Sequence, residues 1–203
     1  MSQNQQFEVS NILIESGLFI YSINEEEKTA SIYDYYRIKI KNVIIPSTII
    51  YKSKEYIVTK ISKNSLGYSD FESIDFEQNS QLKTIEKFAF YFSKIKILHF
   101  PSSLIELKEG WCKDTAQLTQ IHIMPNNQNF ILFNDKYIVE RNQEDKTYDK
   151  LIFASRSITL AHIPSFIKQI GPYAFDNCKL LEGIQISDDS KLQSINKYAF
   201  YNS

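Results

Sequence analysis

The three histidines of the chain occupy matching places in a repeated phrase, so metal binding or pH sensing is the first chemistry to consider. His99, His122 and His162 each lie between two apolar residues at the end of a short β-like segment. Imidazoles bind zinc and titrate near neutral pH. If the residues between the segments loop out, the three rings lie on adjacent strands. The alternative is a position that accepts any polar residue, because Asp75 is the only carboxylate at this place and no cysteine joins it.

Other catalytic chemistry finds little support in the sequence. Cys112 and Cys178 fall at positions that the repeat predicts to be packed, which favours buried free thiols over a disulfide. The five glycines form no phosphate-binding loop, and no G-x-S-x-G, H-E-x-x-H or C-x-x-C motif is present. We therefore expect a protein that is not an enzyme and uses no cofactor. A metal enters only if the histidines act together.

The elements that position these residues belong to a repeat. Apolar units open at intervals close to the roughly 20–29 residues of leucine-rich repeats, and the openings are Ile61, Ile85, Leu107, Ile170 and Ile195. Five places later comes a bulky anchor after a small residue, which predicts a tight helical turn. The anchors are Leu66, Phe90, Cys112, Phe175 and Phe200. Such units stack on one another to share a core. The fold expected is a right-handed leucine-rich repeat solenoid with a parallel concave β-sheet and short helical turns or loops on its convex side.

Each turn is followed by an L-x-x-L-x-L phrase whose last part predicts a short strand with alternate residues pointing inward. The residues between the inward ones then share one exposed surface. Apolar and polar side chains mix there, as they do at many binding sites; scattered exposed apolar residues are the ordinary alternative. The candidate partner-binding residues are Asp75, Ile97, His99, Gln120, His122, Met124, Leu160, His162 and Gln185.

The period divides the chain into four segments. Residues 1–58 contain two hairpin patterns and predict a β-rich N-terminal cap. Residues 59–124 carry regular repeats. Residues 125–157 break the period with short apolar runs joined by polar turns, which predicts an inserted β-meander. Repeats resume over residues 158–203 and stop after the Phe200 anchor, so we expect either a longer native chain or a second copy covering this end.

Composition limits the partners. The formal net charge is −1, which offers no basic excess for nucleic acid. The longest apolar runs are too short to span a bilayer, so we expect no membrane insertion from this segment. The start, MSQNQQFEVS, shows neither the basic nor the apolar part of a signal peptide.

Residues Ile170-Gly171-Pro-Tyr-Ala174-Phe175-Asp-Asn-Cys178, followed by Leu181-x-x-Ile184-x-Ile186, resemble the BspA-type leucine-rich repeat family. The resemblance covers roughly residues 18–203. Departures exist, because Ile61-Ser62, Ile85-Glu86 and Leu107-Lys108 lack the family's glycine. Ser69, Ser93 and Thr115 replace its cysteine.

The resemblance implies adhesion or surface-antigen display through binding of a host matrix or cell-surface protein, in a secreted or surface-attached form. An intracellular scaffold for signalling or cytoskeletal partners is the alternative, in which case the protein is cytoplasmic. The histidine positions alone support a third reading, metal-dependent pH sensing.

Overall fold

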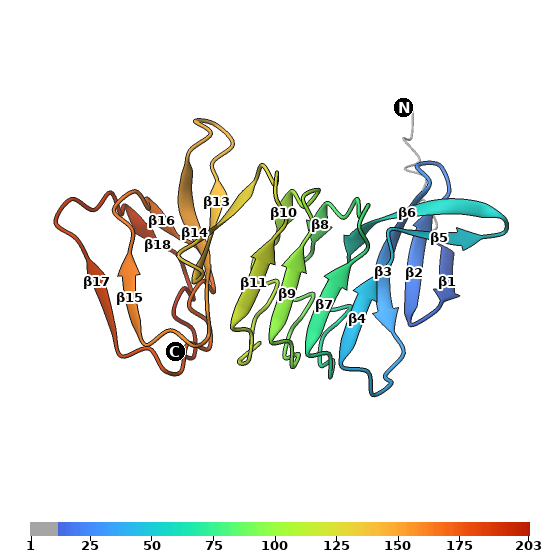
Figure 1. Cartoon of the computed structure of the whole chain (residues 1–203), viewed down its shortest axis with the longest axis horizontal. Helices are drawn as coiled ribbons and strands as arrows, with labels where there is room; N and C mark the ends of the chain where they lie inside the picture. The colour runs from blue at the N-terminus through green and yellow to red at the C-terminus, as the bar shows by residue number, and fades with distance from the viewer. Residues whose placement is uncertain (1–11) are drawn as a thin grey trace, which may run out of the picture.

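The structure is a computed structural model that describes residues 12–203, and its regular elements are strands joined by turns. The repeat units, called rungs here, lie side by side along the long axis of the molecule (Figure 1). No helix occurs between residues 12 and 203, so of the two expected forms of the turn the loops are right and the helical turns are wrong. The reason is a left-handed residue at two places in each turn, such as Phe88 (φ 59°) and Phe92 (φ 56°). A right-handed helix cannot contain such residues.

The N-terminal part is built on a mixed sheet, sheet A, in which the two predicted hairpins are antiparallel pairs. Its later members, from β3 onward along the sheet, pair in parallel. Sheet A contains β1 (Ile12–Ser16), β2 (Phe19–Asn24), β3 (Thr29–Tyr35), β5 (Thr48–Tyr51), β6 (Lys54–Ile61), β8 (Thr84–Ile85) and β10 (Glu106–Leu107). The strands of the segment expected as the cap, residues 1–58, lie in this sheet except β4 (Asn42–Ile45), and the first eleven residues are outside the described part.

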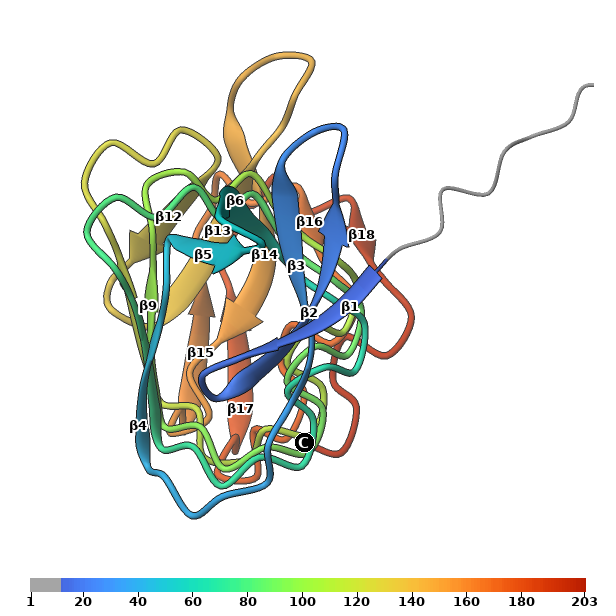
Figure 2. The same ribbon diagram turned by 90° about the vertical axis from the view of Figure 1, so that its right-hand side faces the viewer.

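Sheet B is the parallel sheet of the first repeat block. It contains β4 (Asn42–Ile45), β7 (Ser73–Phe76), β9 (Ile97–Phe100) and β11 (Gln120–Ile123) in that spatial order. β4 comes from the segment expected as the cap, yet it pairs in register with β7. The sheet faces the viewer in Figure 1 and lies on the left in the end view of Figure 2, opposite β1 to β3.

The insertion forms the meander that the sequence predicts. β12 (Phe130–Phe133), β13 (Tyr137–Arg141) and β14 (Tyr148–Ala154) are antiparallel neighbours. β14 then pairs in parallel with β16 (Gln169–Ile170), and β16 pairs with β18 (Ser194–Ile195), which completes sheet C. β15 (Leu160–Ile163) and β17 (Gly183–Ile186) form a separate two-stranded sheet D. The meander thus begins a second block of sheets instead of looping out of the first.

The predicted anchors form the core. Leu66, Phe90 and Phe175 are fully buried, and Cys112 is nearly so. Phe200 in the last rung is half-buried and stacks on Phe175 with ring centroids 4.7 Å apart. Trp111, in the rung whose small and large residues are inverted, packs edge-on against Phe90 at 6.1 Å. Leu66, Phe90 and Cys112 belong to one cluster of buried residues, and Phe175 belongs to a second, against which Phe200 packs.

The turns of neighbouring rungs are also joined by backbone hydrogen bonds, along what we call the turn edge (residues 62–70, 86–94, 108–116, 171–179 and 196–203). The rungs are numbered from the unit that opens at Ile61, so rung two opens at Ile85. In rung two, the N–H groups of Phe90 and Phe92 donate to the carbonyls of Trp111 and Lys113, at 2.9 and 3.1 Å. Equivalent bonds join Phe175 N to Ala199 O and Asn177 N to Tyr201 O. The exposed backbone of each turn is satisfied by the next turn.

Candidate functional site

The outward surface of sheet B, called face B here, carries most of the candidate partner-binding residues. Ile74, Leu98 and Ile121 point into the core and are buried. Because side chains alternate along a strand, the residues between them point to solvent. Face B therefore presents two rows across the sheet, which are Asn42, Ser73, Ile97 and Gln120, and Ile44, Asp75, His99 and His122.

His99 and His122 form the centre of the second row. Their rings stack with centroids 4.6 Å apart and an angle of 12° between their planes. Nδ1 of His99 lies 2.6 Å from Oδ1 of Asp75, across the β7–β9 pair. A hollow of about 150 Å³ adjoins the group and is lined in part by Asp75, His99 and Met124. A carboxylate, two imidazole rings and a thioether therefore lie close together on this part of face B.

The apolar part of face B surrounds this centre. Met124 is 51% exposed just beyond the end of β11, and Ile44 on β4 is 65% exposed. Ile97 is partly exposed, and Gln120 beside it is exposed. Exposed apolar side chains that lie together with polar ones are common at protein-binding surfaces.

The expected line of three adjacent histidines is wrong. His162 lies on β15 in sheet D, where its strand neighbour is Gln185 on β17. Leu160 also belongs to sheet D, beside Gly183. β15 does not pair with β11, because meander strands begin between the two and build sheet C instead. Over the described residues, no group of three or more histidine, cysteine, aspartate or glutamate side chains is arranged to hold a metal ion.

At the insertion, the turns of rung three and rung four are joined by side-chain hydrogen bonds, whereas the other neighbouring turns are joined by backbone hydrogen bonds. Asp176 from rung four accepts a 2.7 Å hydrogen bond from the backbone N–H of Asp114 in rung three. Asn177 Nδ2 donates to Oδ1 of Asp114 at 2.8 Å. The shortened turn of the insertion leaves Asp114 without the backbone acceptor that its equivalents use. Asp176 supplies that acceptor.

Arg156, from the insertion's own turn, fills the space behind this contact. Its side chain and that of Asp176 are completely buried, and the guanidinium lies 3.8 Å from the carboxylate. Nη1 donates to the carbonyls of Ala154 and Ala174 at 3.1 and 3.2 Å. Burial raises the pKa of Asp176, and the nearby Arg156 opposes that shift. We call Asp114, Arg156, Asp176 and Asn177 the splice cluster.

The two cysteines flank the same guanidinium and are free and buried, as predicted. Cys112 Sγ lies 3.5 Å from Nη2 of Arg156, and Cys178 Sγ lies 3.8 Å from Nη1. Burial raises the pKa of Cys112 to about 12 and also raises that of Cys178. A thiol that stays protonated at neutral pH and is closed to solvent is a poor nucleophile.

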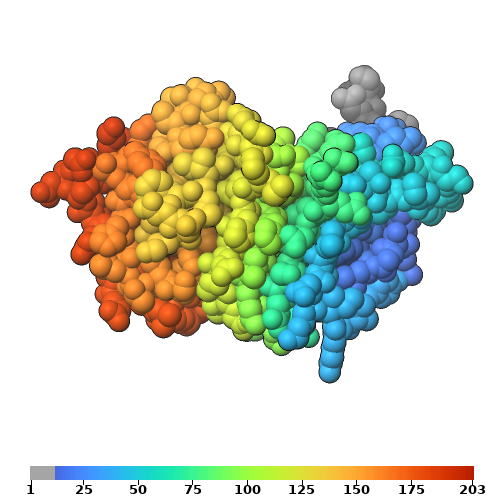
Figure 3. All heavy atoms as spheres, viewed as in Figure 1, coloured from blue at the N-terminus to red at the C-terminus, as the bar shows by residue number. Residues whose placement is uncertain are grey.

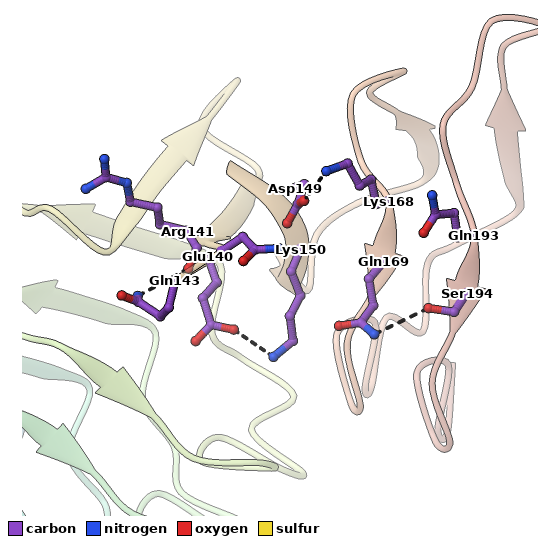
Figure 4. Close-up of a pocket in the computed structure, with 10 residues that line it drawn as sticks. Glu140, Arg141, Gln143, Asp149, Lys150, Lys168, Gln169, Gln193 and Ser194 are labelled. Atoms are coloured by element: carbon purple, nitrogen blue, oxygen red, sulfur yellow. Dashed lines mark hydrogen bonds and ion pairs between the residues drawn. The ribbon is translucent and has the colours of Figure 1, made fainter. Parts of the chain in front are cut away.

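The insertion contributes a second surface, a polar hollow of about 380 Å³ on sheet C, lined by residues of β13, β14, β16 and β18 and of the turns beside them (Figure 4). Lys150, Gln169 and Ser194 lie in register across three strands. Lys150 pairs with Glu140 at 2.7 Å, and Lys168 pairs with Asp149 at 2.9 Å. Arg141 also lines the hollow and forms no ion pair within the described residues, so the lining carries one positive charge in excess.

Comparison with known proteins identifies the repeat. Residues 20–136 and 145–203 match the model of the BspA type Leucine rich repeat region, in six copies. The chain belongs to the BspA-type leucine-rich repeat family. This family is a protein-interaction repeat family that includes surface antigens. Ile170 to Ile186, with their glycine, alanine, phenylalanine and cysteine, are thus repeat residues of this family.

Solved structures resemble this BspA-type chain at low identity. A leucine-rich repeat protein from Eubacterium ventriosum superposes with a TM-score of 0.57 and 16% identity, covering 92% of this chain and 62% of that one. A leucine rich cell surface protein from Faecalibacterium prausnitzii gives 0.46 and 12%, covering 93% and 77%. The pneumococcal vaccine antigen PcpA gives 0.45 and 15%, covering 95% and 68%. The Eubacterium ventriosum protein shows a shared leucine-rich repeat fold, and this chain spans under two thirds of it. No curated protein matches the chain.

The described part contains no helix with the length and apolar character that a bilayer crossing requires.

Sequence reasoning missed the splice cluster altogether. Its one available signal was Arg156, a long cation placed two residues after the apolar run Leu151 to Ala154.

Proposed function

We propose that this chain is a non-enzymatic recognition module that binds a protein partner through face B. The observation that carries the proposal is the set of exposed apolar residues around the His99–His122 stack, on a rigid parallel sheet. Strands hold such side chains at fixed spacing, which lowers the entropy cost of binding. Histidine rings and methionine add flat and adaptable contact area.

The proposal includes a particular geometry. The rungs wind as a right-handed solenoid, and face B lies on its concave side. Residues 1–58 cap residues 59–124, and the meander of residues 125–157 separates them from the repeats at 158–203. Leu160, His162 and Gln185 on sheet D form a second, smaller contact area beside the polar hollow of the insertion.

The setting proposed is the cell surface, with a host matrix or cell-surface protein as the partner. The support is membership of a family that includes surface antigens. The near-neutral net charge of −1 gives no support to a nucleic-acid partner. Labelling of intact cells with a reagent that cannot cross the membrane tests the setting. Labelled protein supports surface display, whereas protein that stays unlabelled and fractionates with cytosol supports the intracellular scaffold instead.

Binding through face B is tested with two substitutions in exposed positions. The purified chain is first used to capture partners from a panel of host matrix proteins. The affinity of a captured protein is then measured for the unaltered chain and for the double variant Ile97→Glu with His122→Glu. We expect weaker binding at an unchanged melting temperature, because both side chains point to solvent. Unchanged affinity at an unchanged melting temperature would refute the proposed surface.

A second copy of the chain is a further proposed partner, at the last rung. Ile184, Ile186 and Ile195 are 40%, 51% and 53% exposed, whereas the equivalent residues of earlier rungs are buried or only partly exposed. Pairing of two such ends would cover them. Sedimentation velocity across a concentration series should show a dimer that Ile186→Asp abolishes. A monomer at all concentrations would rule this contact out.

A further inference from the structure

Sheet B has a free edge at its N-terminal side. β4 pairs with β7 on one side, and no strand among residues 12–203 pairs with its other side. In the end view of Figure 2 this edge lies on the left, while β1 and β2 cross the end of the core on the right. A free strand edge presents backbone N–H and C=O groups to any extended chain that can reach it.

An apolar hollow of about 600 Å³ adjoins this edge. One wall comes from Leu18 and Phe19, at the turn between β1 and β2 and the start of β2, and the other from β4 and β5. Ile44 and Ile50 on its rim are 65% and 64% exposed. Side chains of an added strand would therefore find apolar surface beside the backbone edge.

The segment before β4 carries three cations in alternation with apolar residues. It reads Tyr36-Arg37-Ile38-Lys39-Ile40-Lys41, and every one of these residues is exposed. Hydrogen bonds of 2.7 and 2.9 Å, from Ile38 N to Tyr36 O and from Ile40 N to Ile38 O, hold the segment in a narrow extended form. It stands out below β3 and β4 as a light blue projection (Figure 3). Within the described chain, Lys41 forms an ion pair, whereas Arg37 and Lys39 form none.

The occupied edge of β4 shows which sequence such an edge accepts. β7 lies in parallel there within the stretch Glu72-Ser-Ile-Asp-Phe-Glu77. Glu72 pairs with Lys41 at 2.8 Å, and the carboxylate of Glu77 accepts hydrogen bonds from Ser47 N and Oγ at 2.7 and 2.8 Å. Ile74 points into the core between them. An acidic residue followed by alternating apolar residues is thus the pattern that fits β4.

We propose that the free edge of β4 binds an extended acidic–apolar peptide segment of a partner protein by strand addition. The acidic residue meets Arg37 and Lys39, the apolar residues fill the hollow beside Ile44 and Ile50, and backbone hydrogen bonds extend sheet B by one strand. The contact uses a backbone edge and not the centre of face B, so either proposal can fail without the other.

The probe is a synthetic peptide with the sequence of residues 70–79, Asp-Phe-Glu-Ser-Ile-Asp-Phe-Glu-Gln-Asn. We expect saturable binding to the full chain by fluorescence polarisation. Hydrogen exchange should show new protection at amides of residues 42–45 that exchange in the free protein. The same peptide with proline in place of its isoleucine should not bind, because proline disrupts strand pairing.

Variants then separate edge binding from general charge attraction. Arg37→Glu with Lys39→Glu should weaken peptide binding about tenfold, while the matched reversal Lys146→Glu with Lys191→Glu should leave it unchanged. Ile50→Glu should also weaken binding, and Ile97→Glu on face B should not.

Four results would overturn the proposal. The first is absence of binding at about 1 mM peptide, which is the weakest specific affinity of interest. The second is equal binding of the proline peptide, and the third is protection that falls outside β4. The fourth is binding of the chain to anionic lipid vesicles without binding to the peptide. Melting temperatures of all variants close to that of the unaltered chain ensure that lost binding is not lost folding.

Discussion

At the turn edge, rung three contacts rung four directly, through Asp114, Asp176 and Asn177. On the strand side, β11 and β15 do not pair with each other, and the meander starts new sheets between them. The same insertion is therefore bridged on one side of the molecule and left open on the other. A turn needs one or two acceptors for its free N–H groups, which a side chain can supply. A strand needs a whole backbone partner, which no side chain can replace.

This difference also explains how the binding surfaces are divided. Face B ends at β11, so His99 and His122 stack on each other while His162 belongs to a separate sheet. The splice cluster keeps the two blocks of rungs in contact at the turn edge. The candidate partner-binding residues of face B and the splice cluster consequently lie on opposite sides of the rungs.

The largest effect is expected at Arg156. Arg156→Ala leaves the Asp176 carboxylate buried without its cation and opens a void, so it should lower the free energy of unfolding by about 3–5 kcal/mol. Urea denaturation measures the loss. Arg156→Met with Asp176→Asn should recover part of it, because the void is filled and no charge remains buried. Lys94→Ala, which removes an exposed ion pair with Asp70, is the control and should leave the denaturation midpoint near that of the unaltered chain.

A smaller effect, with a definite sign, is expected from pH. Burial raises the pKa of Asp176 above its ordinary value of 3.8. Above that pH the unfolded chain releases a proton that the folded chain still holds, so the contribution of Asp176 to stability is complete below 3.8 and declines as pH rises through the raised pKa. The unfolding free energy of the unaltered chain, minus that of Asp176→Asn, should fall between pH 3.8 and neutrality. A difference that rises with pH would mean that Arg156 outweighs burial.

The smallest effect is a coupling on the strand side. A double-mutant cycle with His99→Ala and His122→Ala should give a coupling of about 0.5 kcal/mol, because the rings are in contact. The matched cycle with His122→Ala and His162→Ala should give none. Equal couplings in both cycles would show that sheet B continues into sheet D.

Much of the fold follows from spacing alone. The units opening at Ile61, Ile85 and Ile170 place each anchor in the core, and strand alternation places His99 and His122 outside. The break between β11 and β15 could not be predicted, because it depends on which distant strand β14 selects as its neighbour. The period alone does not specify that choice. The helical turns were wrong because each turn contains two left-handed residues, a backbone conformation that the spacing of apolar residues does not specify.

The sequence predicted only those parts of the candidate site that depend on the alternation of inward and outward side chains along a strand. The outward rows on sheet B follow from period two. Arg156 could not be assigned, because its burial results from a shortened turn and from Asp176 in another rung. The free edge of β4 was hidden in a stretch that the sequence groups with the cap.

The most direct test of the central claim is the affinity of a captured protein partner for two matched pairs of variants. Ile97→Glu with His122→Glu alters face B, and Leu160→Glu with His162→Glu makes the same kind of change on sheet D. Recognition centred on face B predicts that the first pair raises Kd about tenfold or more, while the second pair, in the smaller contact area, raises it by about threefold or less, with melting temperatures unchanged. An unchanged Kd for the first pair, or an equal rise for both, would contradict it.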